Sequence, residues 1–89
     1  MAVRLFRALP QALKRGVKDG IRLHLQDNDP TEETRNKFRL RRPSPYADYE
    51  LRLGDVRVFY RVQGEVVEVV LIGRKRGGRL LIGGQEFQV

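Results

Sequence analysis

The feature that most constrains the fold is the alternation of apolar and polar residues along YELRLGDVRVFYRV, residues 49–62. This is the period of a β-strand with one buried face, and it continues on both sides of Gly54-Asp55. Glycine supplies the positive φ that a tight hairpin turn requires. A two-residue turn at this point sets the register and puts Arg52 opposite Arg57 on the half-exposed face. The sequence therefore predicts a hairpin on which two arginines face each other.

Two opposed arginines destabilise a sheet, because like charges directly opposite on neighbouring strands lie only about 5 Å apart. Two arrangements can offset this repulsion. In one, Glu50, Asp48 or Glu68 neutralises the pair in a surface salt-bridge lattice, which contributes little to stability. In the other, both guanidiniums converge on one phosphate, whose oxygens match the guanidinium fork. The basic run at 74–76 is expected to reach the same face and favours the phosphate, but the residues leave both arrangements open.

The N-terminal part of the chain has a helical pattern instead. Pro10 suits the first turn of a helix, where its missing N–H is not needed, and the segment 27–30 ends the pattern. The sequence therefore predicts a helix over about 10–26, preceded by a short segment at 3–9. His24 is expected to be a structural histidine where the helix meets the sheet. Five apolar residues recur every four positions: Leu9, Leu13, Val17, Ile21 and Leu25.

The remaining segments complete an antiparallel meander. Residues 31–47 are expected to be a basic connector, mostly loop with at most one helical turn, which Phe38 and Leu40 anchor to the core. The segment VVEVVLIG, residues 66–73, is apolar on both faces, as a central strand is. One or two short strands are expected after it: Leu80-Leu81-Ile82 and Glu86-Phe87-Gln88. A helix or helices packed on such a sheet make an α+β fold, and 89 residues are enough for one core, so 1–89 is expected to be a single domain.

Charge and composition indicate the kind of partner. The net charge is +7 and the isoelectric point is about 10.6, which favours a polyanion or an acidic protein. Fourteen arginines and four lysines suit phosphate recognition, and they equally suit a GC-rich genome. The chain has no cysteine, which excludes a disulfide framework, a thiolate nucleophile and a cysteine-built zinc site. With no apolar run of signal-peptide or membrane-spanning length, a cytoplasmic protein without a membrane partner is expected.

Four segments carry a resemblance to a known family. They are Leu9-Pro10 before a helix, Asn28-Asp29-Pro30, the hairpin with its Arg-Val-x-Tyr core at 57–60, and VVEVVLIG followed by basic residues. In this combination, over about residues 8–76, the chain resembles the RelE/ParE superfamily of toxins from type II toxin–antitoxin modules. The resemblance implies N-terminal helices packed on an antiparallel sheet.

The resemblance also implies an activity and its residues. RelE-like toxins cut mRNA in the ribosomal A site: the ribose 2′-hydroxyl attacks the adjacent phosphate, and fixed cations stabilise the charge that develops. By position, Arg52, Arg57 and Lys75 match the basic residues of such a site, with Glu50 as a possible base. The implied partners are the ribosome, mRNA and a cognate antitoxin, with DNA bound only through the antitoxin, and no metal or cofactor is needed. Further basic residues are expected to bind RNA: Arg39, Arg41, Arg42, Arg61, Arg74 and Arg76.

Three departures from the family pattern leave alternatives open. Glu50 stands where RelE-like nucleases carry a lysine, so it is either the base or a group that blunts the site. No tyrosine or histidine follows the basic run at 77–81, and the family's first strand and most of its first helix have no counterpart. Two other functions therefore stand beside the endoribonuclease. One is a ParE-like inhibitor of DNA gyrase, which needs no catalytic residues, and the other is a catalytically silent member that binds only its antitoxin.

Overall fold

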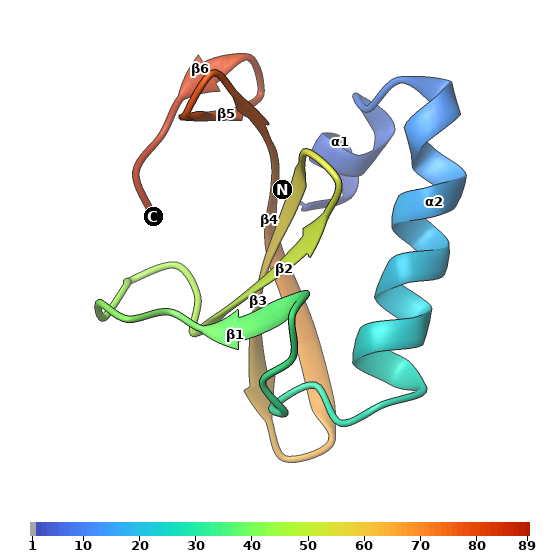
Figure 1. Cartoon of the computed structure of the whole chain (residues 1–89), viewed down its shortest axis with the longest axis vertical. Coiled ribbons are helices and arrows are strands. Elements are labelled where there is room, and N and C mark those ends of the chain that lie inside the picture. Colours follow the sequence, from blue (N-terminus) through green and yellow to red (C-terminus); the bar gives the residue numbers. More distant parts are fainter. Residues whose placement is uncertain (1) are drawn as a thin grey trace.

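The computed structural model describes residues 2–89, which form helices on one face of a six-stranded antiparallel sheet (Figure 1). The strands lie in the sheet in the order in which they occur in the sequence. This arrangement confirms the predicted α+β class and the antiparallel meander. The elements are α1 (Ala2–Arg7), α2 (Gln11–Ile21), the π-helical turn η1 (Arg22–Gln26), β1 (Lys37–Arg39), β2 (Tyr49–Leu53), β3 (Val56–Gln63), β4 (Val66–Arg76), β5 (Arg79–Ile82) and β6 (Gln85–Glu86).

The apolar stripe at four-residue spacing forms a helix at the predicted place. α2 starts after Pro10 and continues directly into η1, and three residues of the stripe, Leu9, Val17 and Leu25, are buried in the core. The predicted helix over 10–26 is therefore confirmed in extent, but its last five residues are π-helical. A pattern of apolar residues does not indicate this geometry. None of the helices within residues 2–89 has the length and apolar character needed to cross a membrane.

The connector at 31–47 is mostly loop, as predicted, but it contains the short strand β1. Lys37 on this strand is only 1% exposed, and its Nζ donates to the carbonyl oxygens of His24 at 2.6 Å and Asp29 at 2.7 Å. A buried ammonium needs such acceptors, because an unpaired buried charge is strongly disfavoured. These two bonds tie the end of η1 and the segment after it to the sheet. Tyr60 adds to this tie, since its hydroxyl donates to the carbonyl oxygen of Pro30 at 2.7 Å.

The helical turn that the connector had room for does not form at Thr31. The Thr31 N–H and hydroxyl both donate to Asp29 Oδ1, at 2.9 and 2.7 Å, which makes a tight turn held by a side chain. At the other end of the chain both predicted short strands are present, with the second at Gln85–Glu86 in place of 86–88. The differences are therefore confined to local turns and strand ends.

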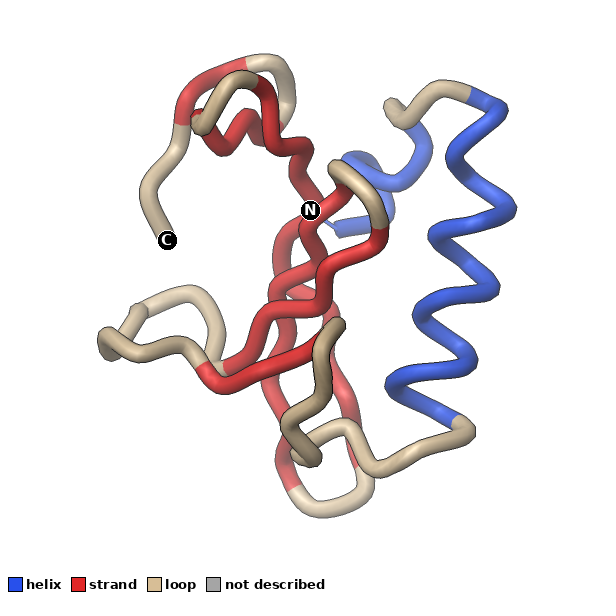
Figure 2. The backbone as a smooth tube through the Cα atoms, viewed as in Figure 1, coloured by secondary structure: helices blue, strands red, loops and turns tan. Residues whose placement is uncertain are grey.

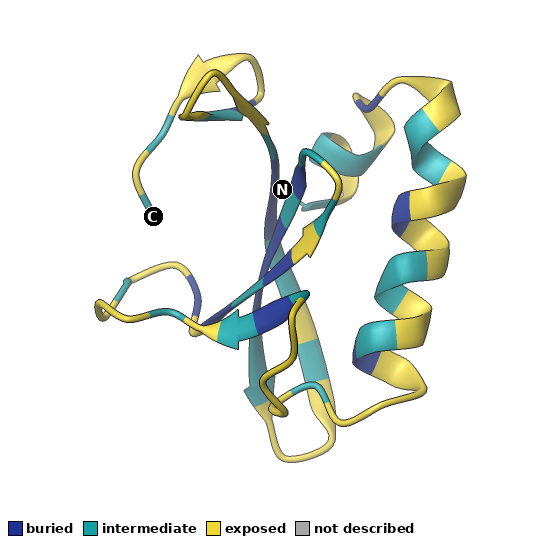
Figure 3. Cartoon of the chain, viewed as in Figure 1, coloured by how far each residue is buried: buried dark blue, intermediate teal, exposed yellow. Residues whose placement is uncertain are grey.

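The sheet buries residues on both of its faces (Figure 3). On the helix face, which α1 and α2 cover, the core is built around Leu51, Val58 and Tyr60. We call the opposite side the open face; it bears Glu50, Arg52, Arg57 and a smaller apolar cluster. That cluster consists of Ala47, Phe59, Leu71 and Ile82.

Two non-regular segments flank the open face (Figure 2). One is the loop before β2, and the other is the C-terminal tail. They meet where the rings of Tyr46 and Phe87 pack edge to face, with centroids 5.2 Å apart. One part of the open face is therefore covered by apolar contacts, and the part next to the β2–β3 turn carries the charged residues.

Candidate functional site

The β2–β3 hairpin holds the predicted arginine pair. Its ladder pairs Arg52 with Arg57 and Leu53 with Val56, which is the predicted register. Gly54 has a φ of 61°, the positive value that the turn requires. The two arginines lie on the open face, because the alternate residues of both strands enter the core on the helix face.

A single carboxylate lies between the two guanidiniums. Glu50 Oε2 is 2.8 Å from Arg52 Nε and 3.6 Å from Arg57 Nε. The side chains of Glu50 and Arg57 are each 13% exposed, so water screens their interaction only in part. Of the two arrangements that the sequence left open, the structure contains the neutralised one, with Glu50 as the acid rather than Asp48 or Glu68.

Arg57 is held in position by the backbone of its own turn. Its Nη1 donates to the carbonyl oxygen of Gly54 at 2.7 Å and to that of Val56 at 3.1 Å. Its Nε is buried and has no hydrogen-bond partner among residues 2–89, since the Glu50 oxygen lies beyond hydrogen-bond distance. The guanidinium is therefore fixed, and its Nε–H has no acceptor at hydrogen-bond distance within residues 2–89.

Arg52 is the exposed member of the pair. Half of its side chain is accessible, and its Nε donates to Glu50 at 2.8 Å. The guanidinium carbon lies 4.6 Å from the centroid of the Phe38 ring, which is the geometry of a cation–π contact. Phe38 therefore orients a charged side chain, a role that the sequence pattern did not indicate, because it marked this residue only as an anchor of the connector.

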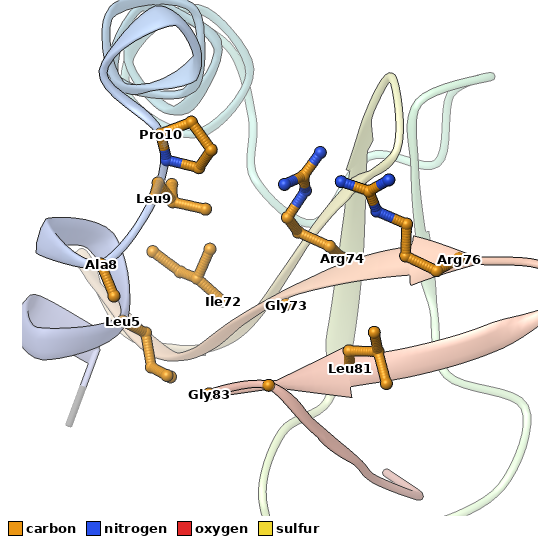
Figure 4. Close-up of a pocket in the computed structure, with 11 residues that line it drawn as sticks. Leu5, Ala8, Leu9, Pro10, Ile72, Gly73, Arg74, Arg76, Leu81 and Gly83 are labelled. Atoms are coloured by element: carbon orange, nitrogen blue, oxygen red, sulfur yellow. The ribbon is translucent and has the colours of Figure 1, made fainter.

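Only one residue of the basic run lies on the same face as the pair. Gly73 is the ladder partner of Arg57, so alternation puts Lys75, two residues further along β4, on the open face. Arg74 and Arg76 extend from the helix face and line a pocket there (Figure 4). The expectation that the whole run reaches the arginine pair is wrong for these two residues, because neighbouring residues of a strand face opposite sides of the sheet.

The other basic residues that were expected to bind RNA have different surroundings. Arg39 lies against Tyr49: its Nη1 is 3.3 Å from the phenol oxygen, and its guanidinium carbon is 5.5 Å from the ring centroid. This contact is on the helix face, away from the arginine pair. Arg61 donates to the carbonyl oxygen of Pro45 and so holds the loop before β2. Two more are exposed on that loop: Arg41 and Arg42.

Two groups that could donate or accept a proton lie elsewhere. Tyr60 is buried on the helix face, and burial raises the pKa of its phenol well above the usual range, with Tyr49 and Asp29 adding to the shift. His24 lies in η1, where burial and then the ammonium of Lys37 lower its pKa. Both residues belong to the helix side of the molecule. Acid–base chemistry next to the arginine pair would therefore depend on Glu50 and Lys75.

The charges on the open face can bind one anion. Arg52, Arg57 and Glu50 are in contact there, and the Arg57 guanidinium is already fixed. Lys75 lies on the same face, with its Nζ 3.4 Å from the carbonyl oxygen of Gly78. A phosphate that displaced the Glu50 carboxylate would meet N–H groups of both arginines at once. Within residues 2–89 no group of three or more His, Cys, Asp or Glu side chains is arranged to hold a metal ion.

Comparisons of this chain with protein-family models, with curated proteins and with solved structures found no match. The chemistry of the open face is therefore the basis for a functional assignment.

Proposed function

We propose that this chain is the toxin of a type II toxin–antitoxin module and that its open face binds and cuts mRNA on the ribosome. One observation carries the proposal: guanidiniums from two adjacent strands approach the same oxygen of Glu50, at 2.8 and 3.6 Å. A site that holds a carboxylate between two arginines also fits a phosphate, because both anions match the guanidinium fork. The resemblance of the hairpin to RelE/ParE toxins supplies the substrate.

The residues of the open face account for each proton and charge of the reaction. Arg52 and Arg57 bind the scissile phosphate, and Glu50, released from Arg52, accepts the proton of the ribose 2′-hydroxyl. The 2′-oxygen bonds to phosphorus while the bond from phosphorus to the 5′-oxygen breaks, and Lys75 donates a proton to that leaving oxygen. The guanidiniums stabilise the charge that develops on the phosphate oxygens, usually the largest single contribution to such a reaction.

A second candidate, the catalytically silent member, is favoured by the same contact. In the protein without RNA, Glu50 neutralises the pair, so a weakly bound RNA would have to compete with a carboxylate already in place. Under this function the toxin fold binds its antitoxin and cuts nothing.

Inducible expression in bacteria, followed by mapping of mRNA 5′ ends, separates these functions. We expect the wild-type chain to arrest growth and to produce cuts inside translated reading frames. Arg57→Ala should abolish the cuts, whereas Arg22→Ala, which removes an exposed charge from η1, should retain them. Circular dichroism of both variants checks that they fold.

Three outcomes would contradict the proposal. Growth arrest with intact mRNA and broken DNA would indicate the gyrase inhibitor. An absence of arrest at verified expression would indicate the silent member. Cuts that persist in folded Arg57→Ala would show that the arginine pair is not the site.

Glu50→Gln tests the role of the carboxylate. Glutamine is nearly the same size but cannot accept the 2′-hydroxyl proton, so cutting should be lost if Glu50 is the base. Cutting that is unchanged or stronger would show that Glu50 instead occupies the phosphate site.

A further inference from the structure

A second pair of opposed arginines lies on the other face of the sheet. Arg76 and Arg79 are ladder partners across the β4–β5 turn, and both are exposed. The nearest acid to Arg76 is Asp55, whose Oδ2 is 3.9 Å from Arg76 Nε, and Arg79 makes no ion pair within residues 2–89. Like charges directly opposite each other destabilise a sheet, so this pair lacks the compensation that Glu50 gives to the first.

An apolar pocket adjoins this second pair. It has a volume of about 690 Å³, and it lies between the turn after α1 and the strands β4 and β5 (Figure 4). Arg74 and Arg76 stand at its edge. Its walls are mostly aliphatic: Leu5, Ala8, Leu9, Pro10, Ile72 and Leu81. Pockets of this size hold drug-sized ligands or a few side chains of a partner.

Arg74 adds a donor that the protein does not use. Its Nη2 donates to Asp55 Oδ2 at 2.9 Å, but its Nε is buried and has no hydrogen-bond partner within residues 2–89. A buried donor without an acceptor is unfavourable, so a ligand or partner that let the Arg74 guanidinium shift toward an acceptor would relieve this loss. Within residues 2–89, Asp55 is the acid that pairs with the arginines around the pocket, and Glu86, the ladder partner of Leu81, is a second carboxylate on this face that makes no ion pair.

We infer that this pocket binds an acidic peptide segment of a partner protein, with an apolar side chain in the pocket and carboxylates on Arg76 and Arg79. Charge complementarity identifies the occupant as anionic, and the aliphatic walls require an apolar anchor beside the charge. Nucleic acid fits less well, since none of the residues within 2–89 that line the pocket has an aromatic side chain to stack on a base. This site is on the opposite face from the proposed nuclease site and does not depend on it.

Selection from a displayed library of random peptides tests the inference on the full chain. Peptides enriched on the wild-type protein should combine Asp or Glu with Leu, Ile or Phe. On the double variant Arg76→Glu/Arg79→Glu, the enriched peptides should become basic and keep the apolar residue, because only the charge at the edge of the pocket has changed. The control Arg15→Glu/Arg22→Glu makes the same change of net charge on exposed positions of α2 and η1 and should select acidic peptides, as the wild type does.

Affinity measurements with one selected peptide complete the test. By fluorescence polarisation, Arg76→Glu/Arg79→Glu and Leu81→Ser should each weaken binding at least about tenfold, a loss of roughly 1.4 kcal/mol. Arg57→Ala should leave the affinity unchanged, so a failure here is distinguishable from a failure of the proposed nuclease.

Several results would overturn the inference. One is that no peptides are enriched on the wild-type protein. Another is that acidic peptides are enriched equally on the charge-reversed variant. The third is that the Arg57→Ala variant no longer binds the selected peptide. Binding of single-stranded RNA or anionic vesicles that Arg76→Glu/Arg79→Glu abolishes, in the absence of peptide binding, would assign the pocket to those ligands instead.

Discussion

The molecule carries two pairs of opposed arginines, one on each face of one sheet, and they are compensated differently. Arg52 and Arg57 face each other beyond the Gly54-Asp55 turn, with the Glu50 carboxylate 2.8 and 3.6 Å from their Nε atoms. Arg76 and Arg79 face each other next to a Gly-Gly turn, and within residues 2–89 one acid pairs with them: Asp55, whose Oδ2 is 3.9 Å from Arg76 Nε. This difference in compensation follows from the exposed fractions of the arginine side chains.

The exposure of the arginines decides which pair needs a counter-ion from within the chain. The Arg57 side chain is 13% exposed, so an internal carboxylate stabilises the first pair in the fold, because water screens a part-buried charge weakly. The Arg76 side chain is 56% exposed, so water and salt screen the second pair and its anion can come from outside. The first pair therefore combines a structural ion pair with a candidate phosphate site, and the second is available to a partner.

The largest difference between the pairs is expected in mRNA cleavage. Arg57→Gln removes a fixed cation from the open face and should slow cleavage by about 10²–10³-fold, as the loss of one donor to a charged transition state does elsewhere. Arg76→Gln removes the same charge from the other face and should leave the rate unchanged. Single-turnover cleavage of a reporter mRNA on purified ribosomes measures both. Equal losses would mean that total charge, and not the first pair, governs the reaction.

The next difference is in stability when each pair loses its acid. Glu50→Ala leaves Arg57 part-buried without its counter-ion and should lower the free energy of unfolding by about 1–3 kcal/mol. Asp55→Ala removes a carboxylate that is 40% exposed and should cost less than about 1 kcal/mol. Urea unfolding at constant ionic strength compares the two variants. If Asp55→Ala cost as much as Glu50→Ala, exposure would not be what distinguishes the pairs.

The sequence predicted that Arg52 and Arg57 face each other. It left open whether an acidic side chain neutralises them or whether they share a phosphate. The turn at Gly54-Asp55 and the period of two fix which residues are opposite each other, so the register followed from local chemistry. Which acid approaches the arginines depends on rotamers, and three acids were possible. The structure selects Glu50, which lies on the same strand two residues before Arg52.

The basic run at 74–76 is where the sequence-based prediction and the structure differ. Alternation, applied to β4 as it was to the hairpin, separates Lys75 from Arg74 and Arg76, yet the run was expected to act as one cluster. Other features had no signal in the sequence: the strand that contains Lys37 is three residues long, and the burial of its ammonium depends on two carbonyl oxygens brought there by η1 and the segment after it. Long-range contacts of this kind are set by packing and not by local patterns.

A smaller effect should distinguish the pairs by their response to salt. Arg79→Gln removes an uncompensated repulsion and should raise the free energy of unfolding by about 0.2–1 kcal/mol at low ionic strength. In 1 M salt the gain should disappear, because the screening length falls to about 3 Å. Arg52→Gln should bring no gain at either ionic strength, since it also removes the hydrogen bond to Glu50. Urea unfolding at both ionic strengths measures these changes, and a gain for Arg79→Gln that persists in 1 M salt would mean that electrostatic repulsion is not its cause.

The smallest expected effect is a dependence of the free energy of unfolding on pH, which should come from His24 and not from either arginine pair. Arginines stay charged at any pH at which the chain folds, so neither pair changes charge near neutrality. His24 does titrate there, and burial followed by the charge of Lys37 lowers its pKa below the usual 6.5. The unfolded chain then binds the proton more tightly than the folded one, so the stabilisation is complete above pH 6.5 and is lost as the pH falls through the lowered pKa of the folded state.

The free energy of unfolding, measured between pH 5 and 7.5, should therefore rise with pH, and His24→Gln should remove this slope. The difference in stability between Arg79→Gln and the wild type should stay constant over the same range. A slope that persists in His24→Gln would assign the titration to a carboxylate, and a difference that varies with pH would mean that the second pair is coupled to a titrating acid.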